Sequence, residues 1–257
     1  MVKFAANLTM LFNEYEFLDR FGAAARAGFS AVEFLFPYAY PREVIAEQLQ
    51  RHSLELALFN LPPGNWEAGE RGLASLPERR SEFEQSVSEA LDYATKLEPK
   101  RLHLMSGNST RSQASAVEAY RRSVEFACRA AAPLGIDIVI EPINPRDMPA
   151  YFLNDFAWTA ELIGELGQAN LKLQYDIYHR QILHGDVLKS LAALLPIIGH
   201  VQIAAVPHRH EPGTGELDDG RILRHLDALG YQGFVGLEYR PKGGTVEGLA
   251  WRKTLGI

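Results

Sequence analysis

Four apolar segments in the second half of the chain each end in a side chain that can bind a divalent cation. These side chains are Glu141, Asp176, Gln202 and Glu238, separated by 35, 26 and 36 residues. Each gap is about one strand–helix unit, so the four would occupy equivalent points of a repeating architecture. Carboxylates at the ends of apolar strands are costly to desolvate unless something pairs with them. The pattern therefore predicts a metal site or a catalytic centre.

The same four side chains indicate which metal would bind. Carboxylate and amide oxygens are hard ligands, suited to Mg²⁺ or Mn²⁺ rather than to Zn²⁺ or copper. Without a cation, three carboxylates this close would repel one another, and at least one would protonate. The alternative is separate pairing of each with Arg or Lys, but four residues at matching positions favour one shared site.

Two further residues close to these positions could act on a substrate. His179 follows Asp176 by three residues, and a neutral imidazole there could donate a hydrogen bond to a substrate oxygen. Capping or packing is the alternative for His179. Asn144, three residues after Glu141, could orient that carboxylate or cap a turn.

Two arginines are candidates to bind a substrate carboxylate, because a guanidinium group matches a carboxylate with two parallel hydrogen bonds. Arg209 is the first candidate and lies in a Pro- and Gly-containing segment, residues 207–216. Arg71 is the second and lies in the long irregular stretch 61–77, a candidate lid. A surface salt bridge is the alternative for either arginine.

Polar residues also interrupt two predicted strands. Glu33 and His103 are each flanked by apolar residues, and an internal polar network is favoured over catalysis for both. Trp66, Phe36 and Tyr239 could form part of a pocket wall, although aromatic residues there more often pack in the core.

The elements that must position these side chains alternate along the whole chain. We expect strands at 4–8, 31–36, 54–60, 101–105, 136–141, 171–176, 200–204 and 234–239. Helices are expected at 14–27, 41–52, 78–97, 114–134, 154–166, 186–195, 220–229 and 246–255, from the spacing of apolar residues. Eight such units in about 250 residues predict an α/β fold, the (β/α)8 TIM barrel. A doubly wound open sheet is the alternative, but the Gly-rich turn typical of its first strand is absent from the sequence.

Composition restricts the function classes. The chain has 257 residues, 47% hydrophobic and 23% charged, as in ordinary globular proteins, and nothing divides it, so a single domain, 1–257, is expected. Its net charge of −6 argues against general nucleic-acid binding. Apolar stretches too short for a bilayer and an N-terminus without a signal-like core predict a cytoplasmic protein with no membrane association. Cys128, the single cysteine, is interpreted as a core residue.

Several motifs together resemble the hydroxypyruvate isomerase family. They are Asn7–Phe12, Val32–Tyr38, Glu141–Asn144, Gln174–His179, His200–Ala204, His208–Glu216 and Gly236–Tyr239. The resemblance covers nearly the whole chain in order, and the family belongs to the wider group of xylose-isomerase-like barrels.

The resemblance implies isomerisation of a small hydroxy-oxo acid, hydroxypyruvate to tartronate semialdehyde. A branch of the family acts on the 2-oxo-tetronate and 3-oxo-tetronate pair. The resemblance also implies that Glu141 and Glu238 transfer protons, with Glu141, Asp176, Gln202 and Glu238 as metal positions. Gln202 stands where many relatives in the wider group carry histidine, so the resemblance does not decide whether the metal is obligatory.

Three alternatives remain at this point. They are a ketose 3-epimerase or sugar isomerase of the same group, an endonuclease IV-like phosphodiesterase and a non-catalytic sugar-acid binding protein. The phosphodiesterase would need a histidine-rich multi-metal cluster and a basic groove, which the charge disfavours. Barrels of this kind often associate, so a homo-oligomer is also among the expectations.

Overall fold

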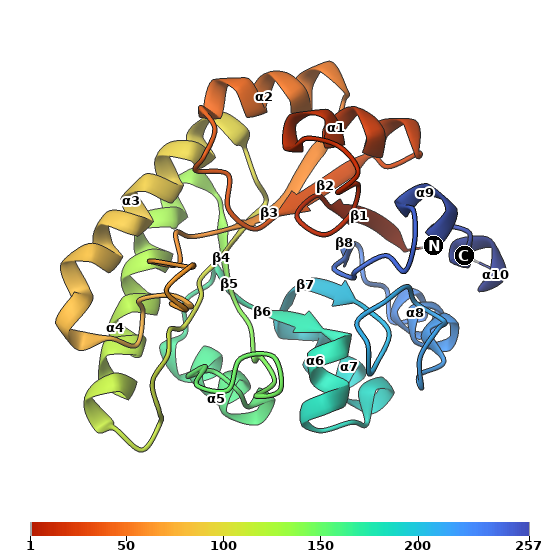
Figure 1. The fold of residues 1–257 in the computed structure, drawn as a ribbon. Coiled ribbons are helices and arrows are strands. Elements are labelled where there is room, and N and C mark those ends of the chain that lie inside the picture. Colours follow the sequence, from red (N-terminus) through yellow and green to blue (C-terminus); the bar gives the residue numbers. More distant parts are fainter. Residues whose placement is uncertain (1, 257) are drawn as a thin grey trace.

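Eight parallel strands close into a barrel in the computed structural model, which describes residues 2–256 (Figure 1). The strands pair in chain order, and β8 returns to pair with β1. Their bounds are β1 Lys3–Asn7, β2 Ala31–Phe34, β3 Glu55–Asn60, β4 Arg101–His103, β5 Asp137–Ile140, β6 Leu171–Asp176, β7 Ile198–Ile203 and β8 Phe234–Leu237. The predicted (β/α)8 fold is therefore confirmed.

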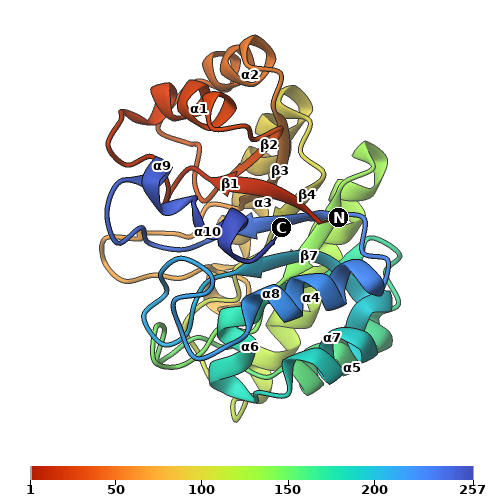
Figure 2. The same ribbon diagram turned by 90° about the vertical axis from the view of Figure 1, so that its right-hand side faces the viewer.

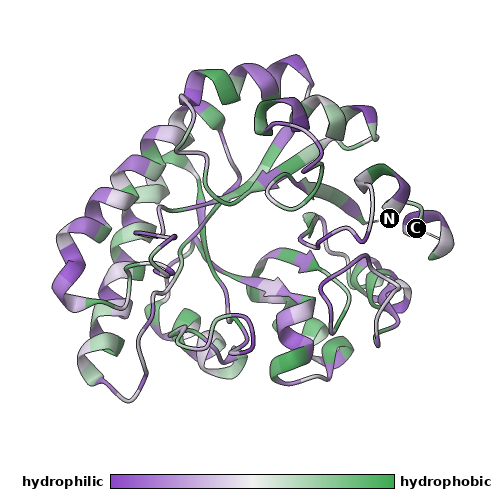
Figure 3. Ribbon diagram, in the orientation of Figure 1, coloured by the Kyte–Doolittle hydropathy of each residue, from purple (hydrophilic) through white to green (hydrophobic). Residues whose placement is uncertain are grey.

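Helices surround the barrel and turn their apolar faces to it, as the colouring by hydropathy shows (Figure 3). They are α1 Phe17–Arg26, α2 Arg42–Arg51, α3 Arg80–Leu97, α4 Ala114–Ala131, α5 Phe156–Leu166, α6 Ile177–Leu183, α7 Val187–Leu194, α8 Asp219–Ala228, α9 Thr245–Gly248 and α10 Trp251–Thr254. Short 3₁₀ helices occupy Pro77–Arg79, Ala132–Leu134 and Leu195–Ile197. No helix in the described part of the chain is both long and apolar enough to cross a membrane.

Two parts of the predicted element pattern were wrong. The helix α6 was not predicted; it begins directly at the end of β6, with no loop between them. The helix predicted at 246–255 is instead two short helices, α9 and α10. Each short helix begins at a residue with a long-range contact: Thr245 is hydrogen-bonded to Glu14, and Trp251 packs edge-on against Phe4.

The inside of the barrel is unusually polar at its carboxyl end. Inward-facing side chains alternate along each strand with side chains that face the helices. Buried polar residues on the strands include Asn7, Glu33, Asn60, His103, Gln174, His200 and Gln202. The long connections gather at this end of the barrel (Figure 2), where TIM barrels form their active sites.

Candidate active site

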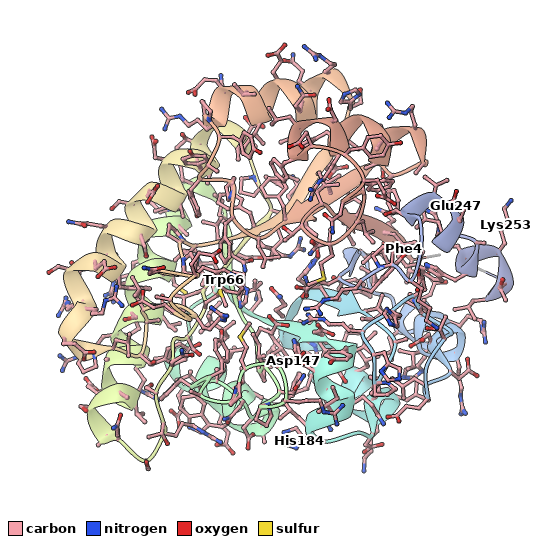
Figure 4. All side chains as sticks on the ribbon, viewed as in Figure 1. Phe4, Trp66, Asp147, His184, Glu247 and Lys253 are labelled. Carbon is pink, nitrogen blue, oxygen red and sulfur yellow. The ribbon has the colours of Figure 1, made fainter. Side chains whose placement is uncertain are left out.

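A cavity of about 610 Å³ opens at the carboxyl end of the barrel. Eight residues were predicted from the sequence to act in catalysis, metal binding or substrate binding, and six of them line the walls, namely Arg71, Glu141, His179, Gln202, Arg209 and Glu238. Trp66 and Asp147 come to it from the connections after β3 and β5, and Figure 4 shows both toward the centre of the barrel mouth. The other two predicted residues, Asp176 and Asn144, are fully buried beside it.

Glu141, Asp176 and His179 form the tightest group of the site. Each offers a ligand atom, and these atoms lie within 4.8 Å of one another. His179 Nε2 is 3.8 Å from Glu141 Oε1 and 3.6 Å from Asp176 Oδ2. Both of these carboxylate oxygens are buried and have no hydrogen-bond partner within the described chain. Unpartnered buried carboxylate oxygens are unfavourable, so they are suited to a ligand that carries positive charge.

Asp176 is the last residue of β6 and the N-cap residue of α6. Its Oδ1 accepts a hydrogen bond of 2.7 Å from the backbone N–H of Tyr178, which caps the N-terminus of α6. This places His179 in the first turn of that helix and points it at the carboxylates. The other oxygen, Oδ2, faces the site.

Asn144 determines which nitrogen of His179 carries the hydrogen. The Asn144 side-chain oxygen accepts hydrogen bonds from the backbone N–H groups of Arg146 and Asp147, both at 3.0 Å. Its Nδ2 therefore faces His179 Nδ1, at 2.6 Å, and must donate. The neutral ring then carries its hydrogen on Nε2, toward Glu141 and Asp176. His179 is thus arranged as a hydrogen-bond donor more than as a metal ligand, and its donation to a substrate oxygen stays a prediction.

Burial keeps His179 uncharged. Desolvation, followed by the positive charge of Arg209 and the proximity of His103, lowers its pKa well below the ordinary 6.5. The predicted neutral imidazole is thus consistent with its surroundings.

Arg209 provides the positive charge of the site. Its guanidinium Nη2 lies 3.2 Å from Glu238 Oε2 and 3.6 Å from Asp176 Oδ2, while Nη1 lies 3.5 Å from Asp147 Oδ2. The same group stacks over the ring of Tyr178, 5.0 Å from its centroid. Burial lowers the pKa of this arginine, but the surrounding carboxylates outweigh that effect and raise it. The surface salt bridge considered for Arg209 is therefore wrong, because the contacts lie inside the cavity.

The three carboxyl groups have raised pKa values. Desolvation is the main cause for all of them. Repulsion from Glu238 and Asp176 adds to it at Glu141, whose pKa is well above the usual range. Arg209 opposes the shift at all three, and the pKa is about 6 for Asp176 and about 8 for Glu238. The site therefore holds protons near neutral pH or binds a cation in their place.

Gln202 and Glu238 are not part of the group of three. Glu238 is in contact with Arg209 instead. Gln202 Nε2 donates to Glu33 at 2.8 Å, and its Oε1 accepts from Gln174 at 2.6 Å. The donor set around Glu141 and Asp176, with the amide oxygen of Gln202 beside it, is compatible with a divalent cation.

Arg71 projects into the cavity from the segment that follows β3. Its guanidinium carbon lies 3.8 Å above the ring of Trp66, and its Nη1 donates to the carbonyl oxygens of Trp66 and Glu70. The guanidinium group makes no other hydrogen bond within residues 2–256, so its remaining N–H groups can meet a ligand. Trp66 in turn packs on Phe36, whereas Tyr239 is fully buried and accepts from Trp251 away from the cavity.

The sequence did not single out Gln174, His200 or Asp147. Gln174 lies two residues before Asp176 and His200 two before Gln202, so each pair shares the inner face of its strand. That spacing was the available signal for both. Glu33 belongs to the internal network that was predicted for it. His103 lines the cavity with its Nε2 3.7 Å from Glu141 Oε2 and without a hydrogen-bond partner in the described chain.

Comparison with known proteins gives a consistent result. The model of the xylose isomerase-like TIM barrel family matches residues 21–255. A 2-oxo-tetronate isomerase of Cupriavidus necator is 48% identical, and the hydroxypyruvate isomerase of Escherichia coli K12 is 42% identical; each alignment covers 98% of both chains. A crystal structure from Brucella melitensis, named as an AP endonuclease of family 2, has a TM-score of 0.96 and 43% identity over 99% of both chains. The chain therefore belongs to the xylose isomerase-like TIM barrel family, in the group of the hydroxypyruvate and 2-oxo-tetronate isomerases.

Proposed function

We propose that the protein isomerises a small hydroxy-oxo acid by moving its carbonyl group one carbon along, with hydroxypyruvate and tartronate semialdehyde as the first substrate pair. The observation that carries the proposal is the pair Glu141 and Glu238, both buried in the wall of one cavity and both with a raised pKa. Glu238, with a pKa of about 8, can both accept and donate a proton near neutral pH, whereas the strongly raised pKa of Glu141 favours its protonated form. The two isomerase relatives support the reaction class.

The reaction requires a proton to leave one carbon and a proton to reach its neighbour. Glu238 or Glu141 removes the proton from the carbon beside the carbonyl group, and the electron pair forms an enediolate. A proton then reaches the former carbonyl carbon, from the same glutamate or from the other. The proton of the substrate hydroxyl group passes to the former carbonyl oxygen, so that the hydroxyl oxygen becomes the new carbonyl oxygen. His179, which carries its hydrogen on Nε2, would donate to a substrate oxygen as negative charge develops there.

We further propose that Glu141, Asp176, Gln202 and Glu238 hold a divalent cation, Mg²⁺ or Mn²⁺. The unpartnered oxygens of Glu141 and Asp176 support these two ligands. Gln202 and Glu238 would join them by turning from Gln174 and Arg209, which they contact in this structure. When bound, the cation supplies positive charge that polarises the substrate carbonyl group. Arg209 shares that environment and keeps Glu238 and Asp176 closer to their ionised form, because its guanidinium group lowers both pKa values against the effect of burial.

Of the two candidate arginines, we propose Arg71 as the one that binds the substrate carboxylate. Arg209 is already surrounded by the carboxylates of Asp147, Asp176 and Glu238. Arg71 is held in the cavity wall by Trp66 and keeps N–H groups available. A guanidinium group fixed in this way can bind a carboxylate with two parallel hydrogen bonds.

The four-carbon pair, 2-oxo-tetronate and 3-oxo-tetronate, is the alternative substrate, which the Cupriavidus necator relative supports. A ketose 3-epimerase would act on sugars that lack a carboxylate, so a requirement for Arg71 would argue against it. Endonuclease chemistry is less well supported, although the Brucella melitensis protein bears the name of an AP endonuclease. The metal-binding group in the described chain contains one histidine, and the net charge of −6 disfavours DNA.

One panel of reactions tests the proposal. The purified protein is incubated in deuterated water with hydroxypyruvate, with 2-oxo-tetronate, with a ketohexose and with a DNA duplex that contains an abasic site. Each reaction is repeated with EDTA and after addition of Mg²⁺ or Mn²⁺. We expect one or both acids to isomerise with deuterium incorporation, with loss of activity in EDTA and recovery with the metal. Absence of turnover and of exchange with both acids would refute the proposed function.

A further inference from the structure

A chain of hydrogen bonds runs beneath the cavity from Glu33, on β2, to Glu141 at the end of β5. Glu33 Oε1 accepts from Gln202 Nε2 at 2.8 Å. Gln202 Oε1 accepts from Gln174 Nε2 at 2.6 Å, and the same Nε2 donates to Glu141 Oε2 at 3.0 Å. All four side chains are buried, and Glu33 is 0% exposed. Glu33 thus reaches the site through two amides and not by direct contact.

Glu33 determines the direction of donation along this series of hydrogen bonds, that is, which side chain donates and which accepts. Its carboxylate faces three side-chain nitrogens, namely Gln202 Nε2, Asn7 Nδ2 at 3.0 Å and His200 Nε2 at 2.6 Å. The Asn7 side-chain oxygen accepts from the backbone N–H of Thr9, so its amide nitrogen must face Glu33. Glu33 Oε1 therefore accepts from Asn7, and the Gln202 nitrogen, which faces the same oxygen, also donates to it.

The orientation of the Gln202 amide in turn determines the orientation of the Gln174 amide. With its nitrogen turned to Glu33, Gln202 must present its oxygen to the other side. Gln174 can donate to that oxygen only through its own nitrogen, and the second hydrogen of the same nitrogen reaches Glu141. If Gln202 were reversed, two N–H groups would face each other. The oxygen of a reversed Gln202 would also face Glu33 Oε1, leaving two acceptors in contact.

The backbone around Glu33, where the series of hydrogen bonds begins, is shaped to fit its carboxyl group. Gly236 lies against the Glu33 carboxyl group, so closely that a Cβ at this position would collide with both carboxylate oxygens. The pairing of β2 with β3 shifts register immediately before Glu33, and that of β6 with β7 shifts immediately before Gln174. Such irregularities turn individual side chains next to active sites.

We propose that Glu33 is a positioning residue of the isomerase: seated against Gly236, it fixes the amide of Gln202 with the oxygen toward the site and makes Gln174 a donor to Glu141. The inference rests on the proposed function, because it assigns Glu141 a proton-transfer role. Glu33 itself does not contact the substrate.

Three variants distinguish the effect of the hydrogen-bonding groups of Glu33 from the effect of its size and position. Glu33→Gln keeps the length of the side chain but replaces one acceptor with a donor. Glu33→Asp keeps two acceptors but shortens the side chain. Gly236→Ala keeps every polar group and displaces the carboxylate. Glu161→Gln and Gly164→Ala, at an exposed glutamate and an open glycine position on α5, are the matched controls.

We expect Glu33→Gln and Gly236→Ala to lower kcat on the order of 10- to 100-fold with little change in KM, as loss of a supporting hydrogen bond does. Glu33→Asp should retain more kcat than Glu33→Gln, and both controls should match the wild type. The side-chain amide resonances of Gln174 and Gln202, assigned from the Gln174→Leu and Gln202→Leu variants in ¹⁵N NMR spectra, should shift in Glu33→Gln. If Glu33→Gln does not fold, Gly236→Ala provides the same comparison.

A kcat within twofold of wild type for both Glu33→Gln and Gly236→Ala would overturn the inference. So would unchanged amide resonances of Gln174 and Gln202 in a folded Glu33→Gln protein. If the wild type isomerises neither acid, the proposed function fails, whereas the NMR comparison still decides whether Glu33 sets the orientation of the amides.

Discussion

Replacement of Glu238 by glutamine should lower activity and raise stability at the same time. The variant keeps the shape of the side chain and an oxygen that can accept from Arg209, which lies 3.2 Å from Glu238 Oε2. It removes the group that we propose to transfer the proton. General acid–base catalysis contributes roughly 10²- to 10⁴-fold to a rate, so kcat should fall by at least about 10²-fold.

The stability effect follows from the pKa of Glu238, raised from 4.5 to about 8, mainly by burial. Between these two pH values the native state binds more protons than the unfolded state, so the free energy of unfolding falls as pH rises. At about 1.36 kcal/mol per pKa unit, the ionised carboxylate costs on the order of 5 kcal/mol above pH 8. Burial of the amide costs about 1–3 kcal/mol, which leaves a net gain of about 2–4 kcal/mol for the variant.

Urea unfolding of the metal-free proteins at about pH 5 and about pH 8.5 measures this difference. The advantage of Glu238→Gln should be large at the higher pH and small at the lower one, where Glu238 of the wild type is protonated. Glu161→Gln, on the exposed face of α5, should behave as the wild type at both pH values. Near-wild-type isomerisation by Glu238→Gln, or a lower stability at about pH 8.5, would refute the reasoning.

Two further predictions concern Arg71 and Cys128. Arg71→Ala should raise KM for the acid substrate about 10- to 100-fold in steady-state assays, with a smaller change in kcat. This rise in KM corresponds to the loss of about 1.5–3 kcal/mol, as expected for hydrogen bonds to a charged group. An unchanged KM would show that the carboxylate is bound elsewhere. Cys128 is buried and its pKa is raised to about 12, mainly by burial, so the native protein should not react with a thiol reagent at pH 8. One equivalent should react after unfolding, and rapid labelling of the native protein would contradict this assignment.

The eight strands could be predicted because apolar runs and helical spacing follow each other so regularly. The start of α6 could not, because the residues after Asp176 look like a loop motif in the sequence. Only the hydrogen bond from the Tyr178 N–H to Asp176 begins a helix there. Thr245, where α9 begins, is hydrogen-bonded to Glu14, more than 200 residues away, and no local pattern contains that contact.

The sequence indicated which residues belong to the site, but it did not indicate which of them contact one another. Strand-end positions indicated Glu141, Asp176 and Glu238, because parallel strands bring their carboxyl ends together. The pairing of Arg209 with Glu238 was not predictable, because it depends on a loop residue held at a φ of 56°. The link from Glu33 to Gln202 joins strands that are far apart in the sequence, and closure of the barrel brings them together.

The two oxygens of Asp176 connect the site to the helix that follows it. Oδ1 holds the first turn of α6, while Oδ2 faces Arg209 and His179. A ligand that pulls on Oδ2 therefore also pulls on the turn that carries His179. Because no loop separates β6 from α6, one short segment sets the positions of both the Asp176 carboxylate and the His179 imidazole.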